Sequence, residues 1–152
     1  MTHYWLMKSE PDAFSIDDLK RLKKSPWDGV RNYQARNFMK EMKEGDKVFF
    51  YHSSCSPSGI AGTAKVSKKA YPDHTSWDAS SYYFDPKSTQ DNPRWFMVDV
   101  EFVEKWPSIL TLAELKQDSV LADMLLTKKG NRLSVMPITK DEWEYITVML
   151  KK

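Results

Sequence analysis

Three short patterns in this 152-residue chain mark the starts of helices. Each places Ser or Thr three residues before Asp or Glu, so that each side chain can accept a hydrogen bond from the other residue's backbone N–H. These capping boxes predict helices over 15–24, 112–118 and 140–150. A fourth helix is predicted over 33–43, where one apolar side is formed by Ala35, Phe38, Met39 and Met42.

Between the helices lie short apolar or alternating segments that are typical of strands. They predict strands over 3–8, 47–52, 59–70, 94–105 and 133–136. Short strands interspersed with helices, without repeats, indicate an α+β fold with neighbouring strands mostly antiparallel. The longest irregular segment, 72–93, has the length of a functional or flexible loop. We expect one domain over 1–152, since this length can bury a proper core.

Composition limits the possible chemistry. Cys55 is the only cysteine, which excludes an intramolecular disulfide and a cysteine-based metal site. His3 and His74 lack partners at metal-ligand spacing, so we expect no metal and no cofactor. The net charge of +2 argues against extensive nonspecific coating of nucleic acid.

The chain also gives an expectation about its location. No apolar run approaches the roughly 20 residues that span a bilayer. Without a leader-like segment, we expect a monomeric cytoplasmic protein, nuclear in a eukaryote.

The segment 27–37, Trp-Asp-Gly-Val-Arg-Asn-Tyr-Gln-Ala-Arg-Asn, is the strongest functional signal. Pro26 and Gly29 favour a loop around Trp27. A loop indole beside Asn, Gln and Arg could stack a base and read its polar edge. The same residues allow a structural interpretation, in which Trp27 plugs the core and Asn32 caps the next helix.

Seven motifs occur in an order that resembles one known family. They are Tyr4–Pro11 (YWLMKSEP), the 27–37 segment, Tyr51-His-Ser53, Gly59-Ile-Ala-Gly62, Tyr71-Pro-Asp73, Pro93-Arg-Trp95 and Arg132-Leu-Ser-Val135. Together they resemble the EVE domain family over about residues 3–149. The resemblance implies a PUA-like fold, in which a curved, barrel-like, mostly antiparallel sheet carries flanking helices. It also implies recognition of modified cytosine in DNA.

Ser54 and Ser58 depart from the family pattern, which leads us to expect Asn and Pro there. Both residues fall in one loop, so the departure bears on ligand selectivity rather than on the fold.

The chain is also similar in outline to YTH modules, which grip a methylated base between tryptophans. That likeness points to Lys8, Ser9, Trp27 and Trp77 as ligand-binding residues. The neighbouring polar and turn residues complete the candidate pocket: Glu10, Pro11, Val30, Arg31, Asn32, Tyr51, His52 and Ser53. Candidate phosphate contacts are Arg36, Lys65, Lys68 and Arg132, although a run of charges is usually a solvated face.

Three other functions remain open. The pocket could bind a modified base in RNA instead of one in DNA. A small nucleotide-directed hydrolase could use His52 and Glu10, but no Gly-x-Ser-x-Gly elbow is present, and we expect no catalytic residues. A protein-interaction domain with a structurally filled pocket is the third possibility.

Overall fold

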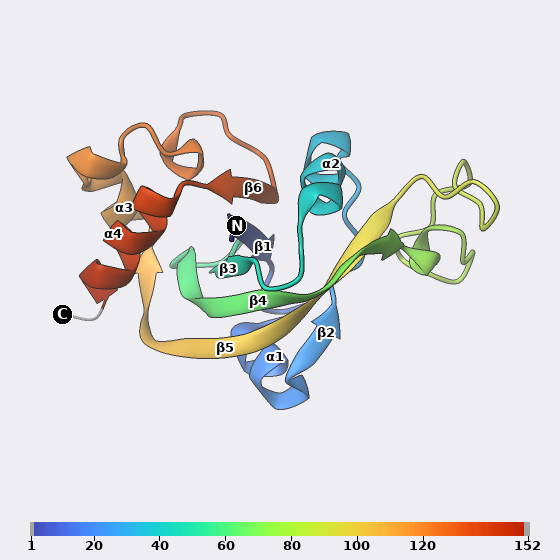
Figure 1. Cartoon of the computed structure of the whole chain (residues 1–152), viewed down its shortest axis with the longest axis horizontal. Helices are drawn as coiled ribbons and strands as arrows, with labels where there is room; N and C mark the ends of the chain where they lie inside the picture. The colour runs from blue at the N-terminus through green and yellow to red at the C-terminus, as the bar shows by residue number, and fades with distance from the viewer. Residues whose placement is uncertain (1, 151–152) are drawn as a thin grey trace.

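The computed structural model describes residues 2–150 and contains one mixed six-stranded sheet (Figure 1). The strands are β1 (Tyr4–Ser9), β2 (Lys24–Pro26), β3 (Lys47–His52), β4 (Gly59–Pro72), β5 (Phe96–Thr111) and β6 (Val135–Ile138). Their order across the sheet is β2-β5-β4-β3-β1-β6. The β1–β3 pair is parallel and the other neighbours are antiparallel. The predicted α+β fold is confirmed, but β2 and β6 lie at opposite edges, so the sheet is not closed into a barrel.

The four predicted helices are present, and three of them begin at their capping boxes. They are α1 (Ile16–Leu22), α2 (Tyr33–Glu41), α3 (Leu112–Gln117) and α4 (Lys140–Leu150). The reciprocal hydrogen bonds of the capping boxes are made at Ser15, Thr111 and Thr139. Short 3-10 turns follow at His74–Ser76, Ser119–Leu121 and Leu125–Thr127. No helix within residues 2–150 is long and apolar enough to cross a membrane.

The strand boundaries differ from the predicted ones. The short strand β2 was not predicted; it is an edge strand, the position in a sheet where Pro26 is tolerated. Strand β5 continues beyond residue 105 to Thr111, and β6 starts two residues later than predicted. The β4–β5 pairing contains several register shifts. Such bulges bend and twist strands, which accounts for the strong curvature of this pair in Figure 1.

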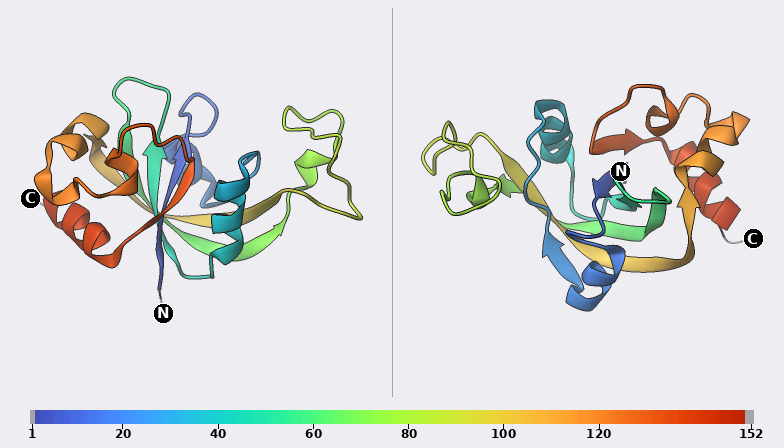
Figure 2. Two further views of the ribbon diagram at one scale, coloured as in Figure 1. Left: turned by 90° about the horizontal axis from the view of Figure 1, so that it is seen from above. Right: turned by 180° about the vertical axis from the view of Figure 1, so that it is seen from behind.

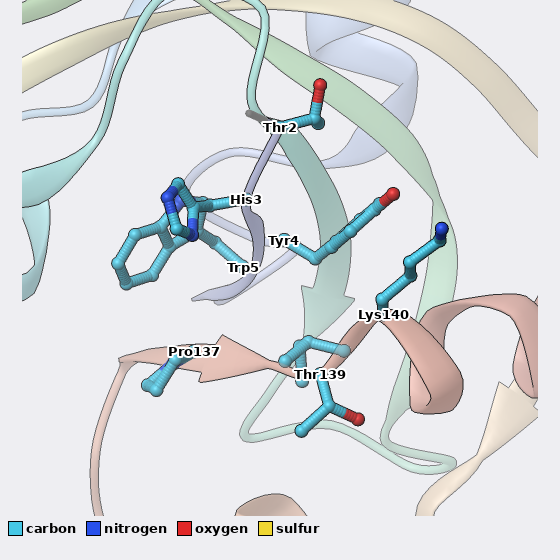
Figure 3. A pocket seen from close by; sticks show the side chains of 8 residues that line it. Thr2, His3, Tyr4, Trp5, Pro137, Thr139 and Lys140 are labelled. Carbon is cyan, nitrogen blue, oxygen red and sulfur yellow. The ribbon is translucent and has the colours of Figure 1, made fainter.

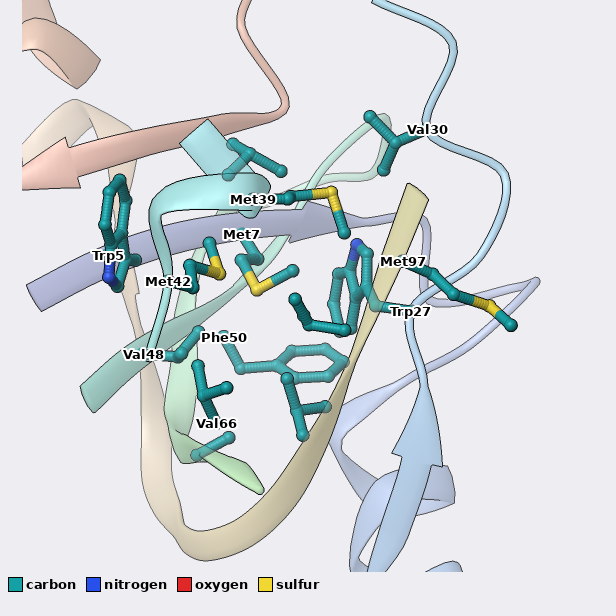
Figure 4. Close-up of a cluster of buried hydrophobic side chains, with 14 of the residues drawn as sticks. Trp5, Met7, Trp27, Val30, Met39, Met42, Val48, Phe50, Val66 and Met97 are labelled. Atoms are coloured by element: carbon teal, nitrogen blue, oxygen red, sulfur yellow. The ribbon is translucent and has the colours of Figure 1, made fainter. Parts of the chain in front are cut away.

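The sheet separates two hydrophobic clusters because successive side chains of a strand point to opposite faces. Phe50 of β3 packs in the cluster covered by α1 and α2, and its neighbour Phe49 packs in the cluster covered by α3 and α4. Figure 4 shows part of the first cluster, which includes Trp27 from the loop after β2. Helices therefore cover both faces of the sheet, and the ends of the strands remain available for a binding site.

Candidate functional site

A cavity of about 560 Å³ opens where β1 and β3 end. These strands run parallel, with Ser9 beside His52, so the loops that follow them lie at the same end of the strands (Figure 2). The loop from β2 to α2 and the long loop between β4 and β5 complete the walls. The lining residues are Lys8, Ser9, Glu10, Ala13, Phe14, Pro26, Trp27, Asp28, Gly29, Val30, Arg31, Ser53, Ser54, Tyr82, Tyr83, Arg132 and Ser134.

Trp27 lies on a loop, as predicted, and also belongs to the core. Its side chain is only 7% exposed and meets Phe50 edge to face, with ring centroids 5.3 Å apart (Figure 4). Phe14 packs against it in the same manner at 6.3 Å. The indole therefore forms a wall of the cavity while it carries core contacts. The two sequence interpretations of Trp27 are compatible.

Arg31 holds two distant loops together, instead of presenting a free cation to phosphate. Its Nη1 lies 3.0 Å from a carboxylate oxygen of Asp73, which is fully buried. Its Nε and Nη2 donate to the carbonyl oxygen of Tyr83 at 3.0 and 2.8 Å. Two further bonds reach the carbonyl oxygen of Val30 and the hydroxyl of Thr75. All five guanidinium N–H groups are thus engaged within the protein.

Arg31, with Asp73 and the carbonyl oxygen of Tyr83, forms a clamp between the Trp27 loop and the long loop. Asp73 lies at the start of the long loop. Burial alone would raise the pKa of its carboxyl group, but hydrogen bonds from Thr75, Gly29 and Arg31 outweigh burial and hold the pKa below the ordinary value. The carboxylate is therefore ionised at neutral pH and fixes the Trp27 loop through Gly29 N–H, at 2.9 Å. The sequence did not single out Asp73 for this role.

The long loop contributes tyrosines to the cavity, whereas Trp77 was the predicted contributor. Trp77 is half-buried and does not line the cavity. Tyr82 and Tyr83 line it instead. Gly29 makes room for Tyr83, since a Cβ atom there would stand 2.6 Å from the phenol ring and the backbone has φ +80°. The two loops are therefore fitted to one another at this glycine.

The end of β1 places polar groups on the cavity floor, as the Lys-Ser-Glu motif predicted. Lys8 is half-buried, its Nζ lies 5.6 Å from the centre of the Tyr51 ring, and burial lowers its pKa. The Ser9 hydroxyl donates to the carbonyl oxygen of Phe14 at 2.6 Å and can still accept a hydrogen bond. Glu10 is exposed at the rim.

Asp28 also lines the cavity; it belongs to the 27–37 segment but was not among the predicted site residues. Its side chain lies at the exposed rim, where desolvation by the surrounding walls and then the negative charge of Asp73 raise its pKa. The cavity thus carries two carboxyl groups, from Glu10 and Asp28, near the cations of Lys8 and Arg132.

Besides Trp77, four predicted ligand-binding residues lie outside the lining. Asn32 is the N-cap of α2 and accepts a hydrogen bond from Ala35 N–H at 2.9 Å, so its structural interpretation is confirmed. Tyr51 is buried in the cluster beneath α3 and α4. The Nε2 atom of His52 accepts from Ile16 N–H at 3.1 Å, and Pro11 lies in the turn after β1.

Of the predicted phosphate contacts, only Arg132 lines the cavity, and it is exposed. Arg36 donates to the carbonyl oxygen of Arg94 and lies 4.9 Å from the centre of the Tyr33 ring. Lys65 pairs with Glu101 on β5 at 3.6 Å, and the Nζ atom of Lys68 lies 4.2 Å from the centre of the Tyr71 ring. These three side chains form contacts on other surfaces.

A second cavity of about 540 Å³ lies between β1, β6 and the start of α4 (Figure 3). Two of its polar side chains have partners within the protein. The Trp5 indole N–H donates to buried Asp46 at 3.0 Å, and Lys140 lies 3.9 Å from Glu144. None of the predicted site residues lines it. The cavity at the ends of β1 and β3 is therefore the candidate functional site.

The fold and this site define a member of a known family. The EVE domain model matches residues 3–149, and the chain belongs to the EVE domain family. The cavity is built from motifs that carry the resemblance in the sequence, at the end of β1 and in the Trp27 loop.

The relatives extend across the whole chain. Human thymocyte nuclear protein 1 is 44% identical over 171 aligned positions, which cover 100% of this chain and 76% of the relative. A Pseudomonas syringae protein of known structure is 55% identical, with a TM-score of 0.94 and coverage of 96% and 98%. The human THYN1 protein has been crystallised in complex with 5-methylcytosine-containing DNA. That structure is 44% identical, with a TM-score of 0.94 and coverage of 99% of each chain.

Proposed function

We propose that this protein is a non-catalytic reader of modified cytosine in DNA, and that the base occupies the cavity at the ends of β1 and β3. The observation that carries the proposal is the lining itself, where the Trp27 indole and Phe14 stand beside Lys8 and two carboxyl groups. The volume of about 560 Å³ suits a single base with part of its sugar. The crystallised human relative supports the choice of 5-methylcytosine as the first ligand to test.

The polar groups of the cavity complement the edge of cytosine. That edge presents an amino donor together with ring-nitrogen and carbonyl acceptors. Glu10 or Asp28 can accept from the amino group, and the Lys8 ammonium can donate to an acceptor. Phe14 and Val30 provide apolar surface for a methyl group, as apolar side chains do for the methyl of thymine in duplex DNA. A base in the cavity must leave its stack, which is how proteins probe a single base in DNA.

The environment of His52 supports binding rather than catalysis. A general base needs a free nitrogen lone pair within reach of substrate. The Nε2 lone pair of His52 is already used by Ile16 N–H, and the ring does not line the cavity. We propose that the protein acts as a monomer in the cytoplasm, or in the nucleus of a eukaryote.

The experiment is a binding series with DNA and RNA oligonucleotides of one sequence that differ only in a single cytosine modification. The proposal predicts tightest binding to DNA with 5-methylcytosine or a close derivative, and recovery of the oligonucleotide with unchanged mass. Tightest binding to a modified RNA would assign the pocket to RNA. Equal affinity for modified and unmodified oligonucleotides, or a change in mass, would refute the reader function.

A further inference from the structure

Tyr82 stands out among the residues around the cavity because it is 94% exposed. It lines the cavity from the long loop, beside the much less exposed Tyr83. Their rings meet edge to face with centroids 5.3 Å apart. A large aromatic side chain in water forgoes the free energy of burial. Its position beside the candidate base pocket leaves the ring available for contact with a partner outside this chain.

The backbone beneath Tyr82 is held in place. The carbonyl oxygen of Tyr83 accepts two hydrogen bonds from Arg31, which is itself fixed by buried Asp73. Inside the loop, Tyr83 N–H donates to the Ser81 hydroxyl at 3.0 Å. In Figure 1 the segment between β4 and β5 projects beyond the sheet, so a body approaching the cavity also meets this loop. The Tyr82 side chain is thus exposed, while the backbone next to it is fixed by hydrogen bonds.

We infer that Tyr82 enters the base stack of duplex DNA at the position that the extruded base leaves. This inference rests on the proposed function. Extrusion leaves an opening one base thick between neighbouring pairs, and proteins fill such openings with aromatic or apolar side chains. A phenol ring has the thickness of a base and can stack on both neighbours. The cavity then selects the base, and Tyr82 favours its extrusion from a paired strand.

If Tyr82 has this role, its loss should affect the binding of duplex DNA differently from the binding of single strands. A free nucleoside, or a flexible single strand, leaves no opening in a helix for Tyr82 to fill. Loss of the ring should therefore weaken binding of duplex DNA by about tenfold or more, the usual range for a lost base–aromatic contact. Binding of the nucleoside and of the single strand should fall much less than binding of the duplex, because the Tyr82 ring is 94% exposed at the edge of the cavity and stacks between two neighbouring pairs only in a duplex.

The test measures the affinity of wild type, Tyr82→Ala and Tyr82→Phe for three probes. These are 5-methyldeoxycytidine, a single-stranded oligonucleotide with one 5-methylcytosine, and the same strand in a duplex. Phe84→Ala is the matched control, since Phe84 is 42% exposed in the same loop and does not line the cavity. Thermal unfolding checks that each variant is folded. Tyr82→Phe and Phe84→Ala should bind all three probes as wild type does.

The outcomes separate this inference from the function on which it rests. Selective loss of duplex binding by Tyr82→Ala supports the inference. Equal loss for all three probes makes Tyr82 a wall of the pocket and overturns it, and so does unchanged duplex binding. A wild type that binds the modified single strand but not the duplex also overturns the inference and leaves the reader function standing. A wild type that binds none of the probes overturns both.

Discussion

Replacement of Arg31 tests whether the clamp between the two loops has been assigned correctly. Arg31→Ala removes the ion pair with fully buried Asp73 and both hydrogen bonds to the carbonyl oxygen of Tyr83. Breaking a buried ion pair by removal of one partner costs about 3–5 kcal/mol. Asp73 keeps its bonds from Gly29 and Thr75, so we take the lower end, about 3 kcal/mol. For a domain of this size, that loss lowers the melting temperature by roughly 6–12 °C.

The assay combines urea denaturation with DNA binding at several salt concentrations. Arg31→Lys keeps the charge but offers three donors without the planar fork, so it should lose about half as much stability. Arg21→Ala is the surface control, because the side chain of Arg21 is 69% exposed and its solvent-screened pairing with Asp18 should contribute little to stability. DNA affinity should fall for Arg31→Ala because Tyr82 and Tyr83 lose their anchor. The dependence of affinity on salt should not change.

A direct phosphate contact by Arg31 predicts the opposite pattern. Removing such a contact lowers the slope of log K against log salt by about 0.9 and leaves stability nearly unchanged. That result would refute the clamp.

Three further predictions concern neighbouring positions. Asn32→Asp, an equally good N-cap, should keep both stability and DNA affinity, whereas Asn32→Ala should cost about 1 kcal/mol of unfolding free energy in urea denaturation. A large loss of DNA affinity in Asn32→Asp would show that Asn32 contacts the ligand. Gly29→Ala should lower both stability and DNA affinity, because its Cβ atom would meet the Tyr83 ring at 2.6 Å and φ is +80°. Wild-type stability and affinity in this variant would contradict the close contact between Gly29 and Tyr83. Burial lowers the pKa of His52, so its contribution to stability is complete above the unfolded pKa of about 6.5 and is lost as pH falls through the lower folded pKa. The melting temperature should therefore drop between pH 7 and pH 5, and should drop less in His52→Gln; an equal drop in the two proteins would refute the role of His52.

The sequence predicted the location of the site better than the roles of its residues. Local signals sufficed for the capping boxes and for the strand ending at Lys8-Ser9, because their hydrogen-bonding partners are near in sequence. They also placed Trp27 on a loop next to the pocket. The resemblance to the EVE family added the curvature of the sheet, which periodicity alone does not specify.

The role of Arg31 could not be predicted because its partners are distant in sequence. Asp73 and Tyr83 lie 42 and 52 positions away, and their approach depends on the fold of the long loop. For the same reason the sequence points to Trp77 in that loop and not to Tyr82, since an indole in a polar context gives the stronger local signal. Ser54 is exposed, lines the cavity and has φ +55°, a conformation that Asn adopts more readily than Ser. This agrees with the expectation of Asn there from the family pattern.

NMR can locate the modified base on the protein directly, with the six tryptophans as reporters. A duplex with one 5-methylcytosine is titrated into ¹⁵N-labelled protein while the indole N–H signals are followed. Trp27 borders the candidate pocket, Trp5 lines the second cavity, and Trp106 and Trp143 lie in the cluster beneath α3 and α4. A base in the candidate pocket should cause a large shift of the Trp27 signal and of the backbone signals of Ser9 and Ser53, with little change at Trp5, Trp106 and Trp143. A shift centred on Trp5, or binding that leaves Trp27 unchanged, would contradict binding of the base in this pocket.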